Sequence, residues 1–367
     1  MAAKSIGILG SRGIPARYGG FETFAEQLAI RLAGSGVDVT VYCELTEPNA
    51  ARTYKGVNLV HVPCVSLGAL TTVIFDLRCL WRARNTHDVV YMLGYGASPF
   101  CFLPRLWGND VWINMDGIEW ARSKWNWLAK FWLKICESAA MRTANVIVAD
   151  AEGIRSHLQE RYARTPQCVV IPYGAELLQV APPEQCLNAF DVNSGAYYLV
   201  VCRLEPENHV LEIVKGFTKS RTSSPLLLFG DKDSGTEYVS QLLQYESTLV
   251  RFMGTLYEAE KLQTLRWHCR AYLHGHSVGG TNPSLLEALG CGNAIIAHDN
   301  PFNREVASVA GRYFRDDDDL ASIIAETDRT RVSDEIRQRS WSIIRQKYTW
   351  SRVTESYLSM LQVSGRT

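Results

Sequence analysis

The first residues with chemical potential are two adjacent glycines, Gly19 and Gly20, which directly precede the helical pattern that starts Phe21-Glu22-Thr23-Phe24. Glycine lets a ligand approach the backbone closely and permits positive φ. The free N–H groups of a helix's first turn favour an anion or a polar oxygen. A strand-to-helix turn that needs glycine for its geometry alone explains the pair equally well. The pattern therefore predicts either a ligand cradle or a turn.

Arg203 is the second candidate, because it follows the apolar run YYLVVC at the start of a loop. An arginine at the carboxyl end of a parallel strand suits a diphosphate, since its planar fork of donors matches phosphate oxygens. A solvated loop arginine is the alternative, and it explains Arg203 better when this residue is taken alone.

The third candidate is a polar turn before a predicted helix, where backbone amides converge on the helix N-terminus. Glu287 lies one turn into that helix, where a carboxylate could accept hydrogen bonds from a ribose diol. A capping or helix-dipole carboxylate is the alternative for Glu287. The turn itself consists of Gly279, Gly280, Thr281 and Asn282.

Several acidic residues follow apolar runs and could do chemistry. Asp116 comes directly after the run VWINM, at the predicted carboxyl end of a strand, and Glu119 lies three residues further on. Asp150 and Glu152 are placed similarly after VIVA, but a helix cap or a surface charge explains them better. The run 316–319 is expected to be a solvated loop and helix start.

Metal and dinucleotide sites are disfavoured. His274, His276 and His298 have no metal-ligand spacing with any cysteine, so strand-end positions are expected for them. The glycines of GILGSRG do not have the GxGxxG spacing of a dinucleotide-binding turn.

The elements that must position these residues alternate between short apolar strands and longer amphipathic helices. This alternation predicts parallel βαβ units with helices on both faces of a sheet. The expected strands of the first half lie at 5–10, 37–44, 56–63, 88–95, 110–116, 144–150 and 168–174, and those of the second half at 197–203, 225–231, 250–254, 271–277 and 294–299.

These elements predict an α/β protein with two doubly wound Rossmann-like domains that face a cleft at the carboxyl ends of both sheets. We expect an N-terminal domain over 1–180, with a linker-like segment at 177–195, and a C-terminal domain over 181–345. The last helix, within 346–367, is expected to cross back to the first domain.

Composition excludes some classes of protein. The 367 residues include 38 Lys+Arg and 38 Asp+Glu, and this balance disfavours a general nucleic-acid binder. Ten cysteines without pairing rhythm, and no recognisable signal peptide, predict reduced thiols in a cytoplasmic protein. No run reaches the roughly 18 apolar residues of a spanning helix.

The whole chain resembles the GT-B-fold retaining glycosyltransferases of family 4. The matching features run in order from Gly19-Gly20-Phe21-Glu22 through IPYGAE and CRLEPEN to SLLEALGCGNAIIAHDNPFNREV and YTWSRV. The stretches GSRGIPARYGGFETFAEQLA, NMDGIEWARSKW and GHSVGGTNPSLLEALG are similar to the bacterial branch that contains rhamnosyltransferases of polysaccharide assembly.

The resemblance implies a role for each candidate residue. Arg203 would hold the donor diphosphate and Glu287 the donor ribose, while Asp116 would line the donor sugar in the active site. Gly19, Gly20 and the turn Gly279-Gly280-Thr281-Asn282 would contact sugar and phosphate. Residues near Met253–Leu256, including Gly254, would flank the base, and the acceptor side would be formed by Tyr18, Phe21, Glu22 and Glu119.

Two positions depart from the family pattern. The family commonly has a lysine shortly after the arginine, where this chain has Glu207-Asn208-His209, and a first glutamate at the position of Gly280. Sugar and phosphate contacts would then depend more on backbone amides and Asn282. This suits a less hydroxylated donor such as a 6-deoxy sugar.

The resemblance implies a metal-independent, retaining transferase that moves L-rhamnose from dTDP-L-rhamnose to a glycan or a polyprenyl-diphosphate-linked acceptor in surface polysaccharide assembly. Arginine and oriented amides would stabilise the charge that develops on the leaving diphosphate, without a metal or other cofactor. A nucleotide-sugar epimerase or hydrolase of the same fold, and a non-catalytic nucleotide-sugar-binding protein, are the alternatives.

The segment 120–142 interleaves aromatic and basic residues. Trp125, Leu128, Trp132 and Ile135 form one helical stripe, and Lys130 and Lys134 lie together elsewhere. Such a helix suits a lipid headgroup interface and would place the protein peripherally on the inner face of the cell membrane. A helix packed against the core of the first domain is the alternative.

Overall fold

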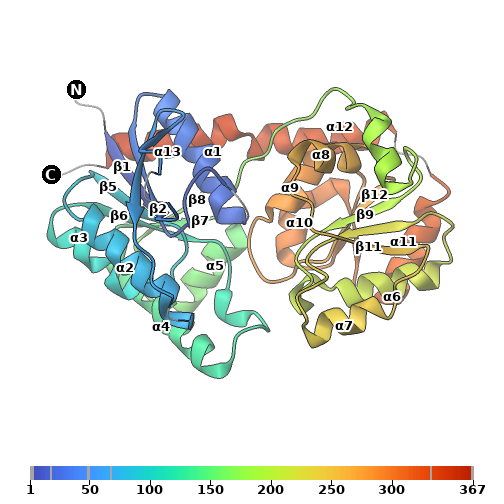
Figure 1. Cartoon of the computed structure of the whole chain (residues 1–367), viewed down its shortest axis with the longest axis horizontal. Coiled ribbons are helices and arrows are strands. Elements are labelled where there is room, and N and C mark those ends of the chain that lie inside the picture. Colours follow the sequence, from blue (N-terminus) through green and yellow to red (C-terminus); the bar gives the residue numbers. More distant parts are fainter. Residues whose placement is uncertain (1–3, 17–18, 48–49, 67, 331–332, 365–367) are drawn as a thin grey trace. The chain divides into compact units, whose positions relative to one another are not determined.

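The chain separates into two compact units in its computed structural model, which describes residues 4–16, 19–47, 50–66, 68–330 and 333–364 (Figure 1). Unit 1 comprises Met1–Ala121, Trp125–Tyr173 and Trp350–Thr367. Unit 2 comprises Arg122–Lys124 and Gly174–Thr349.

Unit 1 is built on an eight-stranded sheet in the order β3-β4-β2-β1-β5-β6-β7-β8, parallel except for the antiparallel pair β3–β4. The strands β5 and β7 are buried along their whole length, as expected for a parallel sheet covered on both faces. The strands are β1 Ser5–Leu9, β2 Asp38–Glu44, β3 Thr53–Tyr54, β4 Val57–Val62, β5 Val89–Met92, β6 Asp110–Met115, β7 Val146–Ala149 and β8 Gln167–Val170.

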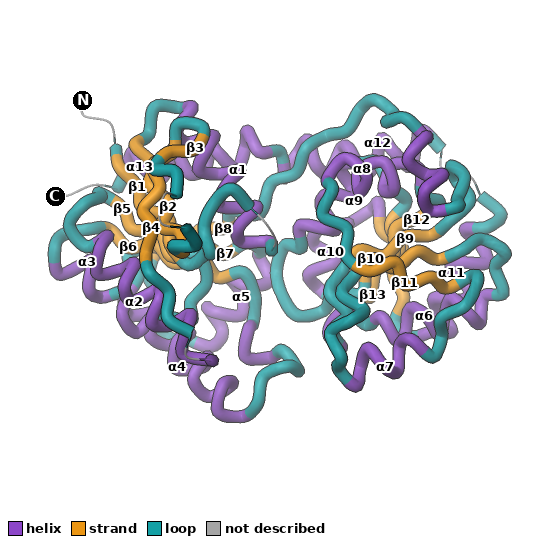
Figure 2. The backbone as a smooth tube through the Cα atoms, in the orientation of Figure 1, coloured by secondary structure: helices purple, strands orange, loops and turns teal. Residues whose placement is uncertain are grey.

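Helices cover both faces of this sheet (Figures 1 and 2). One face carries α1 (Gly20–Gly34) and α13 (Trp350–Val363), and the other carries α2 (Thr71–Ala83), α3 (Phe102–Leu106), α4 (Trp127–Thr143) and α5 (Glu152–Arg161). Right-handed crossovers require this division, because α1 leads from β1 to β2 while α2 leads back across the sheet from β4 to β5.

The last helix, α13, therefore belongs to unit 1 although the chain has already passed through unit 2. The hydroxyl groups of Tyr91 on β5 and Tyr357 on α13 are 2.7 Å apart and hydrogen-bonded. The ring of Phe24 on α1 lies 6.1 Å from that of Trp350 and 6.3 Å from that of Tyr357. The expectation that the C-terminal end packs on the first domain is confirmed for α13.

Unit 2 contains a six-stranded parallel sheet in the order β11-β10-β9-β12-β13-β14. Its strands are β9 Tyr198–Val201, β10 Leu226–Phe229, β11 Val250–Gly254, β12 Ala271–His274, β13 Ile295–His298 and β14 Gly311–Phe314. Its helices are α6 Val210–Ser220, α7 Glu237–Leu243, α8 Ala259–His268, α9 Pro283–Gly290, α10 Pro301–Ala307, α11 Asp317–Thr327 and α12 Asp334–Ile343. The prediction of two parallel-sheet, Rossmann-like domains is confirmed.

Some details differ from the sequence-based expectations. The segment expected to be a plain linker contains a 3-10 helix, Glu184–Phe190, in which Leu187 is buried and which lies against α8. The edge strand β14 was not expected, because its four residues, GRYF, are too few to show an alternating pattern.

Each sheet reverses its winding direction at one point. In unit 1 the reversal lies between β1 and β5, and in unit 2 it lies between β9 and β12. Ligands of open α/β sheets bind beyond the carboxyl ends of the strands at such a point. The loops that follow these four strands are therefore the places to look for function.

Candidate functional site

The glycine pair lies at the start of α1, in the loop that follows β1. Gly19 is the N-cap of α1 and has φ +94°, a conformation that side-chain-bearing residues rarely adopt. A Cβ atom at Gly19 would lie 2.2 Å from Oε2 of Glu22. Gly19 is thus required by its own turn, and both Gly19 and Gly20 are exposed.

Glu22 braces the loop that precedes the helix. Its Oε1 atom accepts a hydrogen bond from the backbone N–H of Arg12 at 3.1 Å. The Arg12 side chain in turn donates to Oε2 of Glu44, at the end of β2, at 3.1 Å. The geometry gives Glu22 a role in holding the loop, and its contact with an acceptor stays a prediction.

Phe21 lies over the end of β5. A Cβ atom at Gly94, which has φ +78°, would lie 3.4 Å from the Phe21 ring. Phe21 is half-buried, so part of its ring remains available to a ligand. Tyr18, the other aromatic residue predicted to bind the acceptor, lies outside the described residues.

Asp116 and Glu119 belong to the loop that follows β6, next to β5 in the sheet. Both side chains are half-buried. The backbone N–H of Glu119 donates to the hydroxyl of Tyr95 at 2.8 Å, which ties this loop to the one that follows β5. Burial raises the pKa of Tyr95, and the Glu137, Glu119 and Asp116 carboxylates raise it further. Tyr95 is therefore a neutral anchor for the loop that carries Asp116.

In unit 2, Arg203 follows β9 and its side chain is 55% exposed. Its guanidinium lies 3.4 Å from the carboxylate of Glu205. Because the arginine side chain is exposed, this ion pair contributes little to stability, and most N–H donors of the guanidinium remain available to a ligand. The backbone carbonyl of Arg203 accepts a hydrogen bond from Nδ2 of Asn208 at 2.7 Å. The loop is therefore fixed while the arginine side chain reaches solvent.

The loops after β9 and β12 touch directly. Oδ1 of the buried Asn208 accepts from His276 Nδ1 at 2.8 Å, and a Cβ atom at Gly275 would lie 1.8 Å from the Asn208 carbonyl oxygen. The backbone N–H of Ser277 donates to the carbonyl of Glu207 at 3.0 Å. Asn208, within the stretch Glu207-Asn208-His209 where the family has a lysine, thus joins two loops.

The second loop leads into α9 through a capped N-terminus. Oδ1 of Asn282 accepts from the backbone N–H of Ser284 at 2.9 Å, and Oγ of Ser284 donates to the Val201 carbonyl at 2.8 Å. Gly279 has φ +152°, while Gly280 and Thr281 are buried. The turn and Arg203 therefore lie on adjacent strand ends of one sheet.

Glu287 forms an ion pair with Arg266 of α8, at 2.6 Å. The Arg266 side chain is only 4% exposed, whereas that of Glu287 is 45% exposed. Burial lowers the pKa of Arg266, but the Glu287 carboxylate, together with Tyr272, Cys291 and Cys269, raises it more, so the pKa lies above its usual value. Arg266 was missed in the sequence because nothing in the helical pattern of α8 distinguishes it from a surface arginine.

Gly254 ends β11 with φ +76° and has no neighbour within 4 Å of a hypothetical Cβ atom, so its conformation alone requires glycine. Its carbonyl accepts from the backbone N–H of Gly230 at 3.0 Å. Lys232, in the loop after β10, donates to the Phe252 carbonyl at 3.0 Å. Lys232 was not predicted as a site residue, although its position after the run PLLLF could have pointed to it.

The histidines occupy strand ends, as expected. His274 ends β12 and His298 ends β13, where the His298 ring stacks on that of His209 at 3.9 Å. Burial lowers the pKa of His276 to about 4, and Arg122 and Arg203 lower it further. Burial also lowers the pKa of His298 to about 4, and the neighbouring His209 lowers it further. Both imidazoles are neutral at pH 7 and serve as hydrogen-bonding groups.

One group of acids in the described part of the chain is close enough to share a metal ion, namely Asp316, Asp317 and Asp318. Oδ1 of Asp316 accepts from the backbone N–H groups of Asp318 and Asp319, which makes it the cap of α11. The expectation of a solvated helix start is confirmed.

One cavity lies apart from all these residues. It has a volume of about 560 Å³ and is lined by Val62, Pro63, Leu77, Arg78, Trp81 and Arg82, between α2 and the end of β4. A second cavity, of about 390 Å³, lies beside two ion pairs, Arg304–Asp299 and Arg315–Asp319. Neither cavity is lined by a residue that the sequence predicted for the donor or acceptor site.

Known proteins resemble this chain in part of its sequence and in its fold. A sequence profile of a domain of unknown function, DUF1972, matches residues 3–176. The chain is 24% identical over 177 residues to the GtfA subunit of UDP-N-acetylglucosamine--peptide N-acetylglucosaminyltransferase from Streptococcus parasanguinis. That match covers 46% of this chain and 32% of the relative, so the chain spans about a third of the length of the curated relative it matches.

Solved structures match the whole chain. Sucrose-phosphate synthase from Thermosynechococcus elongatus has a TM-score of 0.80 at 15% identity, with 98% of each chain covered. HepE from Anabaena, in complex with UDP and glucose, has a TM-score of 0.79 at 15% identity, covering 98% of this chain and all of HepE. A glycosyltransferase from Rickettsia africae ESF-5 has a TM-score of 0.76 at 14% identity, covering 99% and 98%. The fold, with its two Rossmann-like units, is that of the GT-B glycosyltransferases.

Proposed function

We propose that the protein transfers a sugar from a nucleotide-sugar donor to an acceptor. The observation that carries the proposal is the arrangement at the switch point of unit 2. There, an exposed Arg203 after β9 and the N-terminus of α9 after β12 lie on adjacent strand ends, held together by Asn208 and Ser277. A guanidinium fork beside the backbone amides of the glycine-containing turn that leads into α9 suits a diphosphate.

The donor would lie across these loops. Arg203 and the amides of the turn Gly279-Gly280-Thr281-Asn282 would hold the diphosphate, and Glu287, fixed by Arg266 at 2.6 Å, would accept hydrogen bonds from the ribose. Gly254 and its neighbours would flank the base. The same arginine and amides would stabilise charge on the departing diphosphate, so the proposed transfer needs no metal ion.

The acceptor would lie on unit 1, at the carboxyl ends of β1, β5 and β6. Gly19 and Gly20 offer an exposed backbone there, and Phe21 offers part of its ring. Glu119 and Asp116 lie in one loop anchored by Tyr95, with Asp116 proposed to line the donor sugar during transfer with retention.

The donor we favour is dTDP-L-rhamnose. Gly280 stands where the resemblance places a glutamate, so one carboxylate that would bind sugar hydroxyls is missing, and a 6-deoxy sugar has fewer hydroxyls to bind. A glycan or polyprenyl-diphosphate-linked acceptor in surface polysaccharide assembly completes the proposal. The exposed apolar side chains of α4, including Trp127 and Phe131, would bring the protein to the membrane that holds such an acceptor.

Two other functions use the same donor site. A nucleotide-sugar epimerase or hydrolase needs no acceptor, so turnover that depends on a glycan acceptor would exclude it. A non-catalytic binding protein is favoured by one observation, namely that Glu207-Asn208-His209 stands where the family has a lysine and that the Asn208 side chain is used in joining two loops. Tight nucleotide binding without turnover would favour this alternative.

A thermal-shift panel of nucleotide sugars tests the proposal. We expect dTDP-L-rhamnose to stabilise the protein more than UDP-glucose, UDP-N-acetylglucosamine or GDP-mannose does. Arg203→Ala should remove that stabilisation, whereas Arg221→Gln, which changes an exposed cation elsewhere in unit 2, should retain it. A preference for UDP- or GDP-sugars would overturn the choice of donor, and no stabilisation by any of them would overturn the proposed function.

A further inference from the structure

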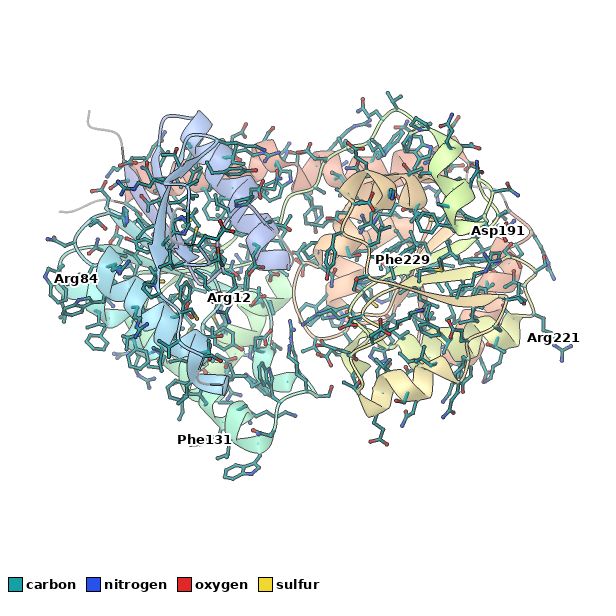
Figure 3. All side chains as sticks on the ribbon, viewed as in Figure 1. Arg12, Arg84, Phe131, Asp191, Arg221 and Phe229 are labelled. Atoms are coloured by element: carbon teal, nitrogen blue, oxygen red, sulfur yellow. The ribbon has the colours of Figure 1, made fainter. Side chains whose placement is uncertain are left out.

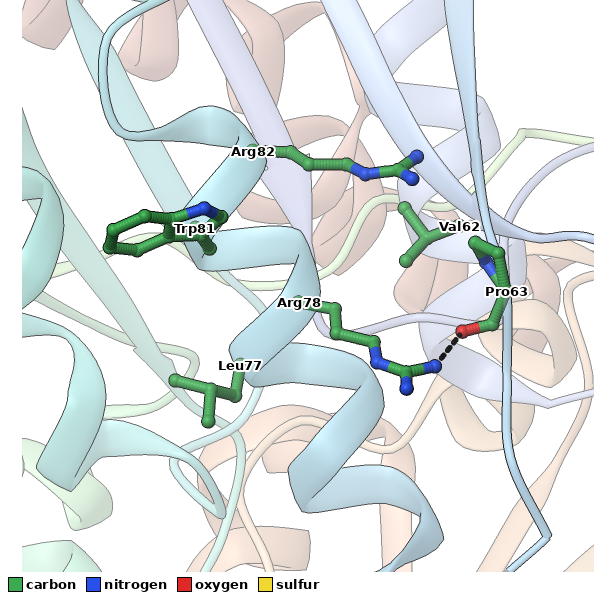
Figure 4. A pocket seen from close by; sticks show the side chains of 6 residues that line it. All are labelled: Val62, Pro63, Leu77, Arg78, Trp81 and Arg82. Carbon is green, nitrogen blue, oxygen red and sulfur yellow. Dashed lines mark hydrogen bonds between the residues drawn. The ribbon is translucent and has the colours of Figure 1, made fainter.

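The cavity between α2 and the end of β4 has a lining that suits an amphiphilic anion (Figure 4). Leu77, Arg78, Trp81 and Arg82 come from α2, and Val62 and Pro63 come from the end of β4. Aliphatic, aromatic and cationic groups thus border one volume of about 560 Å³. No residue of this cavity belongs to the proposed donor or acceptor loops.

The two arginines of the cavity carry charge that no acid neutralises. Arg78 donates to the Pro63 carbonyl at 2.9 Å, and Arg82 donates to the His61 carbonyl at 2.8 Å. In the described part of the chain, neither guanidinium has a carboxylate within ion-pair distance, and Asp76, the single acid of α2, is buried. Their remaining N–H groups, one helical turn apart, can bind a phosphate.

An aromatic cluster continues the surface from α2 to α3. The Arg84 guanidinium lies 3.8 Å from the Trp81 ring and 5.3 Å from the Trp107 ring. The two indole rings meet edge to face at 6.0 Å, although 51% of Trp81 and 40% of Trp107 is exposed. Tryptophan beside arginine is the composition of a membrane–water interface.

Helix α4 continues the surface formed by α2 and α3, and the three helices together are called the α2–α4 layer below. Arg105 of α3 donates to the carbonyl of Arg142 at 3.1 Å, which joins the two helices. On α4, Trp127 is 74% and Phe131 62% exposed, and the acid of this helix, Glu137, is buried (Figure 3 labels Arg84 and Phe131). The other exposed apolar residues of the layer are Phe102, Leu106, Leu128, Trp132 and Ile135.

The charges of the layer point to one kind of partner. Both acids within α2, α3 and α4 are buried, while the exposed cations are Arg78, Arg82, Arg105, Lys134 and Arg142. A second copy of this chain would bring the same cations against one another, because a two-fold contact uses the same surface twice. A bilayer with anionic lipids complements both the charge and the apolar side chains.

We propose that the surface formed by α2, α3 and α4 binds an anionic membrane, with a lipid phosphate held by Arg78 and Arg82 in the cavity. The proposal rests on the membrane contact of α4 that forms part of the proposed function, and it adds a headgroup site and two further helices. It does not depend on which sugar is transferred.

Vesicle flotation of the full chain tests the headgroup site. We expect the protein to float with vesicles in which about a third of the lipid is phosphatidylglycerol, and much less with phosphatidylcholine alone. Replacing both arginines by Arg78→Gln and Arg82→Gln should weaken binding to the anionic vesicles about 25-fold, since each cation near such a surface contributes about fivefold. The matched control, Arg221→Gln with Arg329→Gln, removes two exposed cations of unit 2 and should bind as the wild type does.

The other outcomes separate the alternatives. Unchanged binding of the Arg78→Gln/Arg82→Gln variant, with loss of binding in Trp127→Ser/Phe131→Ser, would overturn the headgroup site and leave the α4 contact standing. Full competition by millimolar glycerol phosphate would show a soluble anion as the ligand, and lipid-free dimerisation that these variants abolish would show a second copy. Either result overturns the proposal. Nucleotide binding, measured without lipid, reports on the proposed function separately.

Discussion

Arg266 and Glu287 form an ion pair of 2.6 Å in which the arginine side chain is buried and nearly half of the carboxylate side chain is exposed. The buried partner is fixed by α8 and the exposed partner projects from the first turns of α9. This asymmetry holds one carboxylate at a set place on the surface of unit 2, beside the turn proposed to bind the donor.

Replacing Glu287 by glutamine should weaken donor binding and destabilise the protein together. Loss of a charge-assisted hydrogen bond of about 1.5–3 kcal/mol lowers affinity about 10–100-fold. Arg266 would be left as a buried cation without an anion, so the melting temperature should fall. Calorimetry and nucleotide titration check both effects.

The control for this prediction is Glu326→Gln, which removes a carboxylate from an ion pair with Arg312 in which both side chains are largely exposed. Such a pair contributes about 0–1 kcal/mol, so the melting temperature should hardly change. Equal losses in the two variants would contradict the special role of the Arg266–Glu287 pair.

Gly19→Ala should damage the turn before α1. Its φ of +94° disfavours any Cβ atom by about 1–3 kcal/mol, and the new Cβ would meet the Glu22 carboxylate that braces Arg12. We expect reduced transfer to the acceptor and a lower melting temperature. Gly34→Ala, at the end of the same helix with no neighbour within 4 Å, should be neutral or stabilising. Equal behaviour of the two variants would refute a strained turn at Gly19.

Asp116→Asn should separate turnover from binding. If Asp116 lines the reacting sugar, the variant should lose about 100-fold or more in kcat while the Kd of the nucleotide changes little. Asp191→Asn, at an exposed position with φ +50° that asparagine tolerates, serves as the control. Unchanged kcat in Asp116→Asn would remove this residue from the active site.

The stability of unit 1 should depend on pH through Asp76. Burial raises the pKa of this carboxyl from 3.8 to about 7, against the opposing effect of Arg12. The fold therefore prefers the protonated form, and the free energy of unfolding should decrease as pH rises from about 4 to about 7. Asp76→Asn removes this loss, so the variant should gain melting temperature over the wild type at pH 8 and little at pH 4. If the melting temperature of Asp76→Asn exceeds that of the wild type by the same amount at pH 4 and pH 8, the titration of Asp76 does not control the stability of unit 1.

Much of the fold follows from short apolar runs in the sequence, because buried parallel strands such as β5 and β7 are continuous stretches of β-branched and apolar residues. The positions of Arg203 and Asp116 near strand ends were predicted for the same reason, since each follows an apolar run, and their roles stay predictions. Arg266 was not found, because its pairing with Glu287 depends on the packing of α8 against α9, which no local pattern records.

In the aromatic and basic segment 120–142, the sequence did not predict which helix face is exposed. Hydrophobic periodicity places Leu128, Trp132 and Ile135 on one stripe, and such a stripe normally faces a core. The structure exposes all three, so the alternative of a core-packed stripe is wrong for these residues. Periodicity identifies residues on a common helix face but not what covers that face.

Among the residues that the structure describes, no helix has both the length and the apolar character that a membrane span requires.

The most direct test of the account is a titration of dTDP-L-rhamnose into the wild-type protein and the Arg203→Ala variant, followed by calorimetry. We predict saturable binding to the wild type, and binding at least about tenfold weaker in the variant, because a charge-assisted contact to the diphosphate is lost. Equal affinity of the two proteins would contradict the placement of the donor on the loops after β9 and β12.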